Sequence, residues 1–216
     1  MVMEKLKVNP AKVHGRPIYH ALKRFFDIIA SAIGLIILFP LFLFLILKIR
    51  HEDGGPAFYS QERIGKNGKP FKMYKFRSMV VNADKLLDQL EDQNEVEGAM
   101  FKMKDDPRIT KIGHTIRKYS LDELPQLWNV LIGDMSLVGP RPPLPSEVEE
   151  YTDYDKQRLM VMPGCTGLWQ VTRRSEADFD EMVWLDIIYI NNSGLFEDFK
   201  LIVKTLGVVI HPNGAY

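Results

Sequence analysis

The chain has 216 residues, and its 28 Lys and Arg residues balance 28 Asp and Glu residues, so the formal net charge is zero. This length suits one domain, with or without a membrane attachment. A nucleic-acid-binding protein would usually carry a basic excess, so the balance predicts no nucleic-acid partner. The single cysteine, Cys165, excludes an internal disulfide and a multi-cysteine zinc site.

The chain begins with a polar segment that contains helix-breaking residues. Pro10, Gly15 and Pro17 interrupt residues 1–20, and such residues favour loops over long helices. We therefore expect residues 1–20 to form a loose or surface-lying arm.

An uncharged, strongly apolar segment of twenty residues follows, from Ile28 to Leu47. At about 1.5 Å per helical residue it would extend roughly 30 Å, enough to cross the hydrocarbon core of a bilayer. A signal peptide would have a shorter apolar run followed by a cleavage site of small residues, whereas Lys48-Ile49-Arg50 follows here. The sequence therefore predicts a membrane helix over residues 21–50.

The flanks and the interior of this segment bear on its path through the membrane. Basic residues precede and follow it: Lys23, Arg24, Lys48 and Arg50. Positive residues mark the cytoplasmic side, and here both ends carry them. Pro40 cannot donate a helical hydrogen bond, and its ring clashes with the carbonyl of Ile36, which favours a kink. We expect a kinked re-entrant helix that enters and leaves by one face, with a simple spanning helix as the alternative.

The remainder, residues 51–216, has the pattern of a small mixed domain. Two short β-prone runs, Ala57–Gln61 and Pro70–Arg77, flank Asn67-Gly68, a strong hairpin-turn signal. No Gly-rich phosphate loop follows a strand, which excludes a doubly wound dinucleotide-binding fold. The predicted fold class is α+β, with a small hairpin-containing sheet surrounded by helices.

Helical patterns occupy much of the rest of this domain, over residues 82–97, 121–132, 146–160, 175–191 and 196–210. The last of them has an apolar and a polar face, which is typical of a helix that lies on a membrane surface. We therefore expect amphipathic interfacial helices in addition to the re-entrant helix.

A pair of acids at the start of one predicted helix is the strongest chemical signal. Ser120 and Glu123 have the spacing of a capping box. Asp122 is not required by that motif, and in a first helical turn the positive end of the helix would hold it ionised and attract phosphate. Arg117 lies shortly before the pair. Arg141 stands between two prolines, where it would lose little freedom on binding a phosphate. Paired acids and fixed cations near a membrane segment suggest phosphoryl chemistry on a lipid.

Four segments carry a family resemblance: KFRSM (Lys75–Met79), SLDELPQLWNVLIGDMSLVGPRPP (Ser120–Pro143), PGCTGLWQV (Pro163–Val171) and FDEMVWLDIIYI (Phe179–Ile190). They resemble the monotopic phosphoglycosyl transferases, the bacterial sugar transferase family, and most of all the undecaprenyl-phosphate glucose or galactose phosphotransferases that initiate exopolysaccharide synthesis. The resemblance extends from about Lys23 to about Val209. Larger members carry further N-terminal regions, so we expect a catalytic-core form, natural or truncated.

The resemblance implies a two-step reaction. Asp122, which matches the aspartate of the family's Asp-Glu dyad, would attack the β-phosphate of a UDP-sugar, expel UMP and hold the phosphosugar covalently. Polyprenyl phosphate would then take the phosphosugar. Glu123 matches the dyad partner, and Mg²⁺ held by Asp122 and Glu123 together with the phosphates would offset the charge of the diphosphate.

The resemblance also implies substrate-binding residues and a location. Five residues fall on other polar positions of the family's motifs: Lys75, Arg117, Arg141, Arg174 and Asp186. The alternatives are that Lys75 and Arg117 are only solvated and that Asp186 only caps or pairs locally. Residues 51–216 would be the catalytic domain, on the cytoplasmic face of the bacterial inner membrane. The implied partners are a UDP-sugar, polyprenyl phosphate and membrane lipid, and a homo-oligomer stays open.

Two other functions are compatible with parts of the pattern. A glycosyltransferase that moves a sugar without phosphate would release UDP in place of UMP. A catalytically silent membrane scaffold of a polysaccharide assembly complex would have little reason to keep Asp122, Glu123 and Arg141 together. The choice between glucose and galactose depends on the partners of one hydroxyl, which no sequence pattern specifies.

Overall fold

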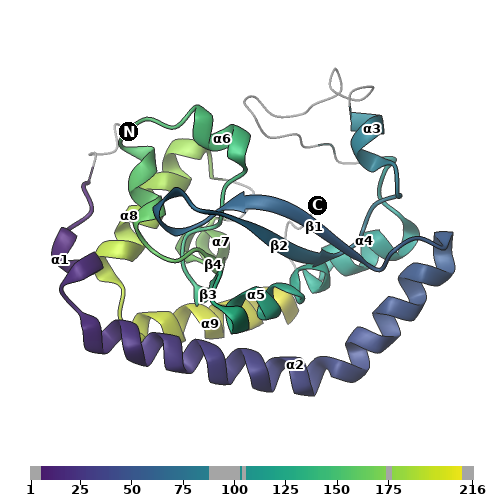
Figure 1. The fold of residues 1–216 in the computed structure, drawn as a ribbon, viewed down its shortest axis with the longest axis horizontal. Coiled ribbons are helices and arrows are strands. Elements are labelled where there is room, and N and C mark those ends of the chain that lie inside the picture. Colours follow the sequence, from purple (N-terminus) through teal and green to yellow (C-terminus); the bar gives the residue numbers. More distant parts are fainter. Residues whose placement is uncertain (1–5, 88–102, 104–105, 174–176, 211–216) are drawn as a thin grey trace.

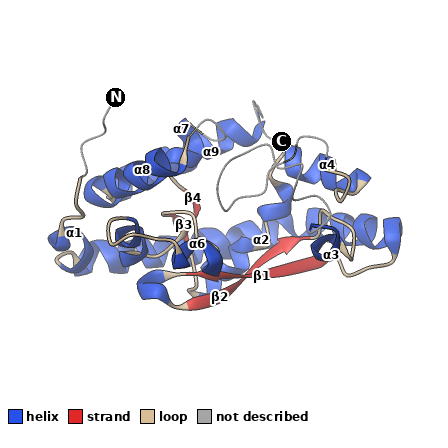
Figure 2. Cartoon of the chain, turned by 90° about the horizontal axis from the view of Figure 1, so that it is seen from above, coloured by secondary structure: helices blue, strands red, loops and turns tan. Residues whose placement is uncertain are grey.

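The computed structural model describes residues 6–87, 103, 106–173 and 177–210. One long helix, α2 (Pro17–Asp53), lies along the lower edge of the molecule in Figure 1, and the strands and shorter helices lie on one side of it. Seen from above in Figure 2, helices α8 (Phe179–Asn192) and α9 (Leu195–Ile210) lie across the molecule from the hairpin of strands β1 (Phe58–Ile64) and β2 (Pro70–Phe76).

Residues 6–16 are more ordered than a loose arm. A short helix, α1 (Pro10–His14), begins after Asn9, whose side chain accepts a hydrogen bond from the Ala11 amide. Val8 and Val13 are buried beside α8 in one hydrophobic cluster. Helix α2 then starts at Pro17 and not at residue 21, because proline suits the first position of a helix. The expected division into arm, membrane helix and catalytic domain stays a prediction.

Helix α2 carries the predicted apolar segment. It continues through Pro40 to Asp53, follows a bent path in Figure 1, and ends at Gly54 in a left-handed conformation with φ 73°. Within the described part of the chain, it is the one helix long and apolar enough to cross a membrane, and 11% of its most apolar window is buried. The core helix of a soluble domain would be mostly buried, so this helix is suited to a membrane.

Both ends of α2 are attached to the same folded body. Near its start, Arg24 donates hydrogen bonds to the carbonyls of Val130 and Leu131 at 2.5 and 2.8 Å. At its end, Asp53 forms an ion pair with Arg77, whose side chain is buried. The exposed apolar part of the helix therefore lies between two anchored ends.

The described part of the domain contains two small sheets. Strands β1 and β2 are antiparallel and joined by the turn η1 (Lys66–Gly68), in which Asn67 and Gly68 have φ values of 58° and 76°. This is the predicted hairpin. Strands β3 (Ser136–Val138) and β4 (Gly164–Thr166) are parallel, and a Cβ on Gly164 would collide with the backbone of Gly139. Each sheet has two strands within the described residues, so the predicted α+β class with a small sheet is confirmed.

Several helices differ from their predicted bounds. Residues 146–160 form α6 (Pro145–Glu149) and η4 (Asp155–Met160), and only α3 (Ala83–Leu87) of the predicted helix 82–97 lies in the described residues. Helix α8 starts later than predicted, at Phe179, because the side chain of Asp178 caps it. The remaining elements are α4 (Lys111–Lys118), η3 (Leu121–Glu123), α5 (Gln126–Ile132) and α7 (Leu168–Thr172).

Three groups of buried side chains hold these elements together. The largest surrounds α8 and includes Val183, Ile187 and Ile190. A second joins the end of α2 to β2 and α4 through Ile49, Phe76 and Ile116. The third, between β2 and α5, consists of Met73, Val130 and Met135. Each buried side chain of this size contributes about 1.5–3 kcal/mol to folding.

Candidate functional site

A cavity of about 300 Å³ lies between the hairpin, α4, α7 and α9. Its charged lining residues come from four separate segments: Lys75, Arg117, Asp122, Glu123 and Arg141. Lys75 is on β2, Arg117 is in the last turn of α4, and Arg141 follows β3. The structure therefore brings together five of the seven residues that the sequence singled out.

The other two predicted residues stand apart from this group. Arg174 lies outside the described residues. Asp186 is fully buried on α8, where Arg158 donates a hydrogen bond to it at 2.5 Å, and it does not line the cavity. This is the local pairing that the sequence left as the alternative for Asp186.

The two acids lie in a tight turn, and not in the first turn of a long helix. A helix over residues 121–132 would need an amide hydrogen at Pro125 and would press its ring against the carbonyl of Leu121. The chain instead forms the short 3₁₀ turn η3, and α5 begins only at Gln126. Ser120 adopts φ 54° and makes no capping hydrogen bond with its side chain, so the predicted capping box is wrong. A left-handed serine next to the two acids is a costly conformation of the kind found at functional sites.

Glu123 is the acid that the neighbouring cations hold. Lys75 Nζ donates to its Oε1 at 2.8 Å, and Arg141 Nη1 approaches the same oxygen at 3.4 Å. Burial would raise the pKa of Glu123, but the charges and hydrogen bonds of Lys75 and Arg141 outweigh it and lower that pKa to about 2. Glu123 is therefore a fixed anion in the physiological range.

Asp122 has the opposite electrostatic environment. Burial and the negative charge of Glu123 raise its pKa to about 6, against the smaller opposing effects of Lys75 and Arg117. The predicted cause of its ionisation, the N-terminus of a long helix, does not apply, because Asp122 lies in η3 and precedes α5. At pH 7 the carboxylate still outnumbers the acid roughly ten to one. The result is an ionised but comparatively basic oxygen at the cavity wall.

Arg141 is positioned by hydrogen bonds to the backbone around it. Arg63 donates to the carbonyl of Pro142 at 3.2 Å, and the Ile64 amide donates to that of Pro143 at 2.9 Å. Arg158, which pairs with Asp186, also reaches the carbonyl of Arg141 at 3.4 Å. The segment Arg141–Pro143 is thus held by hydrogen bonds from the hairpin on one side and from Arg158 of η4, which pairs with α8, on the other.

Helix α7 adds two residues that sequence reasoning did not assign to the site. Trp169 and Gln170 line the cavity, and among the described residues the Trp169 Nε1 and Gln170 Oε1 atoms are buried without a hydrogen-bond partner. Buried polar atoms usually have partners, so these two are available to a ligand. The pair lies in the PGCTGLWQV segment, which was a signal that could have identified it.

Helix α9 closes the cavity with Thr205, Val208 and Val209. The hydroxyls of Thr205 and Thr166 on β4 are 2.7 Å apart, which fixes this helix against the sheet. The outer face of α9 exposes large apolar side chains: Phe196, Phe199, Val203 and Leu206. One side of α9 therefore lines the cavity and another exposes apolar side chains, while its position on a membrane surface stays a prediction.

A divalent cation could use the two acids only together with a ligand. Within the described residues, no cluster of three or more His, Cys, Asp and Glu side chains has the arrangement of a metal site. Mg²⁺ typically takes one or two carboxylates and completes its shell with water and substrate phosphates. Asp122 and Glu123 fit that donor set, since both cations on Glu123 lie at its Oε1 oxygen.

Comparison with known proteins adds a family match and close relatives. The sequence model of a family described as bacterial sugar transferase matches residues 18–212. The chain is 53% identical over 194 residues to the galactosyl transferase CpsE of Streptococcus agalactiae, covering 89% of this chain and 43% of that protein. It is 50% identical over 199 residues to the undecaprenyl-phosphate galactose phosphotransferase of Salmonella typhimurium, covering 90% and 42% respectively.

A third relative is similar along almost its whole length. The exopolysaccharide production protein ExoY of Rhizobium meliloti is 40% identical over 205 residues, which cover 93% of this chain and 91% of ExoY. By contrast, the chain spans less than half the length of CpsE and of the Salmonella protein.

Proposed function

The chain belongs to the bacterial sugar transferase family, and from this premise we propose that it transfers a sugar 1-phosphate from a UDP-sugar to polyprenyl phosphate and releases UMP. The reaction would be the first membrane step of exopolysaccharide, capsule or glycoconjugate synthesis. The names of the relatives support a phosphosugar transfer to a lipid carrier. Two of those names specify galactose, so UDP-galactose is the first donor to test, followed by UDP-glucose.

The observation that carries the proposal is the charge pattern of the cavity. Three cations and two carboxylates line it, with both Lys75 and Arg141 engaged by Glu123. Asp122 is left as the more basic carboxylate, beside the positive charge of Arg117. A cavity that attracts a diphosphate and presents an ionised oxygen to it suits nucleophilic attack on phosphorus.

In the first step, an Asp122 carboxylate oxygen forms a bond to the β-phosphorus of the donor. The bond from that phosphorus to the bridging oxygen breaks, and UMP leaves with the electron pair. Lys75, Arg117 and Arg141 would stabilise the negative charge on the transferring and departing phosphates. Mg²⁺, when bound by Asp122, Glu123 and the phosphates, would supply further neutralisation of that charge.

In the second step, a phosphate oxygen of the polyprenyl phosphate attacks the same phosphorus. The aspartyl phosphorus–oxygen bond breaks, Asp122 returns to a carboxylate, and a polyprenyl-diphosphate sugar leaves. Two displacements at one phosphorus allow a single cavity to serve a soluble donor and a lipid acceptor in turn. The apolar outer face of α9 and the exposed segment of α2 support a lipid acceptor at this site.

The attachment of α2 supports a re-entrant path at the cytoplasmic face of the inner membrane. Arg24 near its start and Asp53 at its end both bind the same folded body. A helix that spanned the bilayer would place these two residues on opposite sides of the membrane, so the same body could not bind both. The catalytic cavity would then face the compartment that contains the UDP-sugar.

The nucleotide released in the reaction tests this function directly. The protein, in detergent or nanodiscs, is incubated with a UDP-sugar and polyprenyl phosphate, and the nucleotide product is identified by chromatography. UMP supports the proposal, whereas UDP identifies a transferase that moves the sugar without phosphate. If neither UMP nor UDP is released from any member of a panel of UDP-sugars, the silent scaffold is favoured. Intact mass after incubation with donor alone would detect the phosphosugar adduct.

A further inference from the structure

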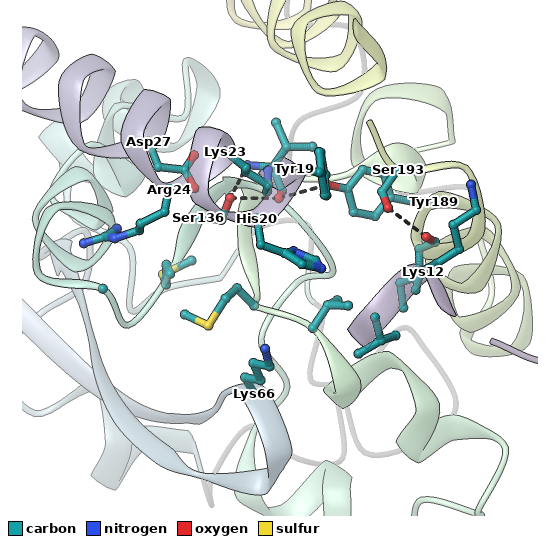
Figure 3. Close-up of a pocket in the computed structure, with 17 residues that line it drawn as sticks. Lys12, Tyr19, His20, Lys23, Arg24, Asp27, Lys66, Ser136, Tyr189 and Ser193 are labelled. Atoms are coloured by element: carbon teal, nitrogen blue, oxygen red, sulfur yellow. Dashed lines mark hydrogen bonds between the residues drawn. The ribbon is translucent and has the colours of Figure 1, made fainter. Parts of the chain in front are cut away.

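A second cavity, of about 210 Å³, lies at the amino end of α2 and is drawn in Figure 3. It is enclosed by the first turns of α2, the tip of the β1–β2 hairpin, β3 and the end of α8. It has no lining residue in common with the cavity of Asp122. The roles assigned above therefore leave it without a function.

Basic side chains line this cavity from α2, from the hairpin tip and from α1, which contributes Lys12. On α2, Lys23 and Arg24 lie about one turn after His20, and Asp27 follows about one turn later. Residues three and four apart share a helix face, so these groups converge on the body that α2 packs against. Lys66 enters from the hairpin tip, and Figure 3 shows it pointing toward His20.

Several of these charges already have partners. Lys23 pairs with Asp198 at 3.0 Å, and Arg24 donates to two backbone carbonyls. Asp27 accepts a hydrogen bond from the Leu137 amide at 3.0 Å. In contrast, no partner of Lys66 is found among the described residues, and the buried Nε2 atom of His20 is likewise unsatisfied there. Lys66 and His20 therefore remain available to a ligand.

The charges that act most strongly on the pKa of His20 are positive. Burial lowers its pKa, and the charges of Lys66, Arg16 and Lys23 lower it further, although a hydrogen bond with the Val13 backbone acts in the opposite direction. The Tyr19 ring lies 5.1 Å from the imidazole, centroid to centroid. An anion bound near these cations would favour the protonated imidazole and convert Nε2 into a hydrogen-bond donor.

We propose that this cavity binds the phosphate group of an anionic ligand through Lys66 and the imidazole of His20. The rest of its wall is largely apolar, with Val13, Met135 and Val161, and would accept carbon atoms attached to the phosphate. The site lies just before the apolar segment of α2 and, with the membrane seating proposed above, would be near the level where phospholipid headgroups meet water. Free phosphate compounds and lipid headgroups have this chemistry in common, and the experiment separates them.

The test follows the imidazole of His20 by NMR in protein labelled with ¹³C-histidine, reconstituted in phosphatidylcholine nanodiscs. His20→Asn identifies its signal among the five histidines. Inorganic phosphate, at ionic strength matched with chloride, is expected to raise the pKa of His20 by at least about 0.5. Lys66→Ala should weaken phosphate binding at least about five-fold. Lys69→Ala removes the same charge from an exposed position of the same hairpin outside the cavity and should leave binding unchanged.

A second arm replaces phosphatidylcholine with phosphatidylglycerol and omits free phosphate. A rise in the His20 pKa in these nanodiscs, lost in Lys66→Ala, assigns the site to a lipid headgroup. A response to inorganic phosphate alone assigns it to a free phosphate compound, and either result supports the proposal. An unchanged His20 pKa in both arms overturns it, as does equal weakening by Lys66→Ala and Lys69→Ala. The readout is independent of UMP release, so the proposed reaction can fail without affecting it.

Discussion

Lys75 donates a hydrogen bond to Glu123 at 2.8 Å. The lysine thereby balances the negative charge of Glu123, whereas the pKa of Asp122 stays raised. The two neighbouring carboxyls consequently have pKa values of about 6 and about 2. Adjacent acids whose environments separate their pKa values commonly have different roles. Here the separation favours Asp122 as the attacking oxygen and Glu123 as a fixed anchor for cations.

Asp122→Asn should abolish phosphosugar transfer. The amide keeps the shape of the side chain but cannot attack phosphorus, so we expect turnover to fall at least about 10³-fold, equivalent to roughly 4 kcal/mol of barrier. UMP release and the intact-mass adduct measure this loss. Asp153→Asn, at an exposed position outside the cavity, is the matched control and should retain activity. An adduct that persists in Asp122→Asn would identify another residue as the nucleophile.

The same substitution should stabilise the fold near neutral pH. Burial and Glu123 raise the Asp122 pKa, so the folded state bears an electrostatic cost whenever this group is ionised. That cost is fully present above pH 6 and is lost as pH falls through 6 toward the unfolded value near 4. Asp122→Asn should therefore raise stability by about 1 kcal/mol at pH 7.5, with no gain at pH 4. Thermal unfolding at the two pH values would contradict this if the gain were equal at both.

The acid limb of the pH–rate profile should move in opposite directions in two variants. For the native chain, kcat/KM should fall about ten-fold per pH unit below the Asp122 pKa of about 6. Lys75→Gln removes a charge that lowers this pKa, so the limb should shift to higher pH. Glu123→Gln removes a negative charge that raises the Asp122 pKa, so the acid limb should shift to lower pH. Shifts of the same sign would show that another group controls the limb.

Removing the charge of Asp186 should destabilise the protein without touching the cavity wall. Asp186→Asn would leave Arg158 buried without its ionic partner, at a cost of about 3–5 kcal/mol. Because Arg158 also holds the Arg141 carbonyl, KM for the donor should rise. Lys200→Ala breaks an exposed ion pair with Glu197 and should cost less than about 1 kcal/mol. Equal losses of thermal stability in the two variants would refute the structural role of Asp186.

The re-entrant path predicts that both ends of α2 face the same compartment. Single cysteines at the exposed positions Ile18 and His51, in a Cys165→Ala background, report this by reaction with a membrane-impermeant maleimide. Both should resist labelling from outside intact spheroplasts and react in inverted vesicles. Labelling of only one position from outside would establish a spanning helix.

Local patterns predicted the elements that depend on neighbouring residues. The hairpin followed from Asn67-Gly68, since positive φ values at these two positions create the turn directly. The apolar run of α2 was equally visible. Pro125 is also a local signal against one continuous helix over residues 121–132, whereas the spacing of Ser120 and Glu123 points the other way, to a capping box that does not form.

The cavity depends on contacts that no local pattern contains. Lys75 and Glu123 are 48 positions apart and meet only because β2 passes beside η3. Trp169 and Gln170 line the same cavity as the two acids because α7 follows β4, which pairs with β3. The family resemblance identified Lys75, Arg117 and Arg141 as a group. Only the fold shows that Glu123 binds two of these cations and that Asp186 pairs with a different arginine, Arg158.

The double role of α9 bears on how far the lipid substrate would have to travel. Thr205 lines the reaction cavity on one side of this helix, while Phe199 and Leu206 are exposed on the other. A helix with its side chains is about 10 Å across. With the membrane seating proposed here, a polyprenyl phosphate would move its charged end by about one helix diameter, and its hydrocarbon chain would stay in the bilayer throughout the exchange.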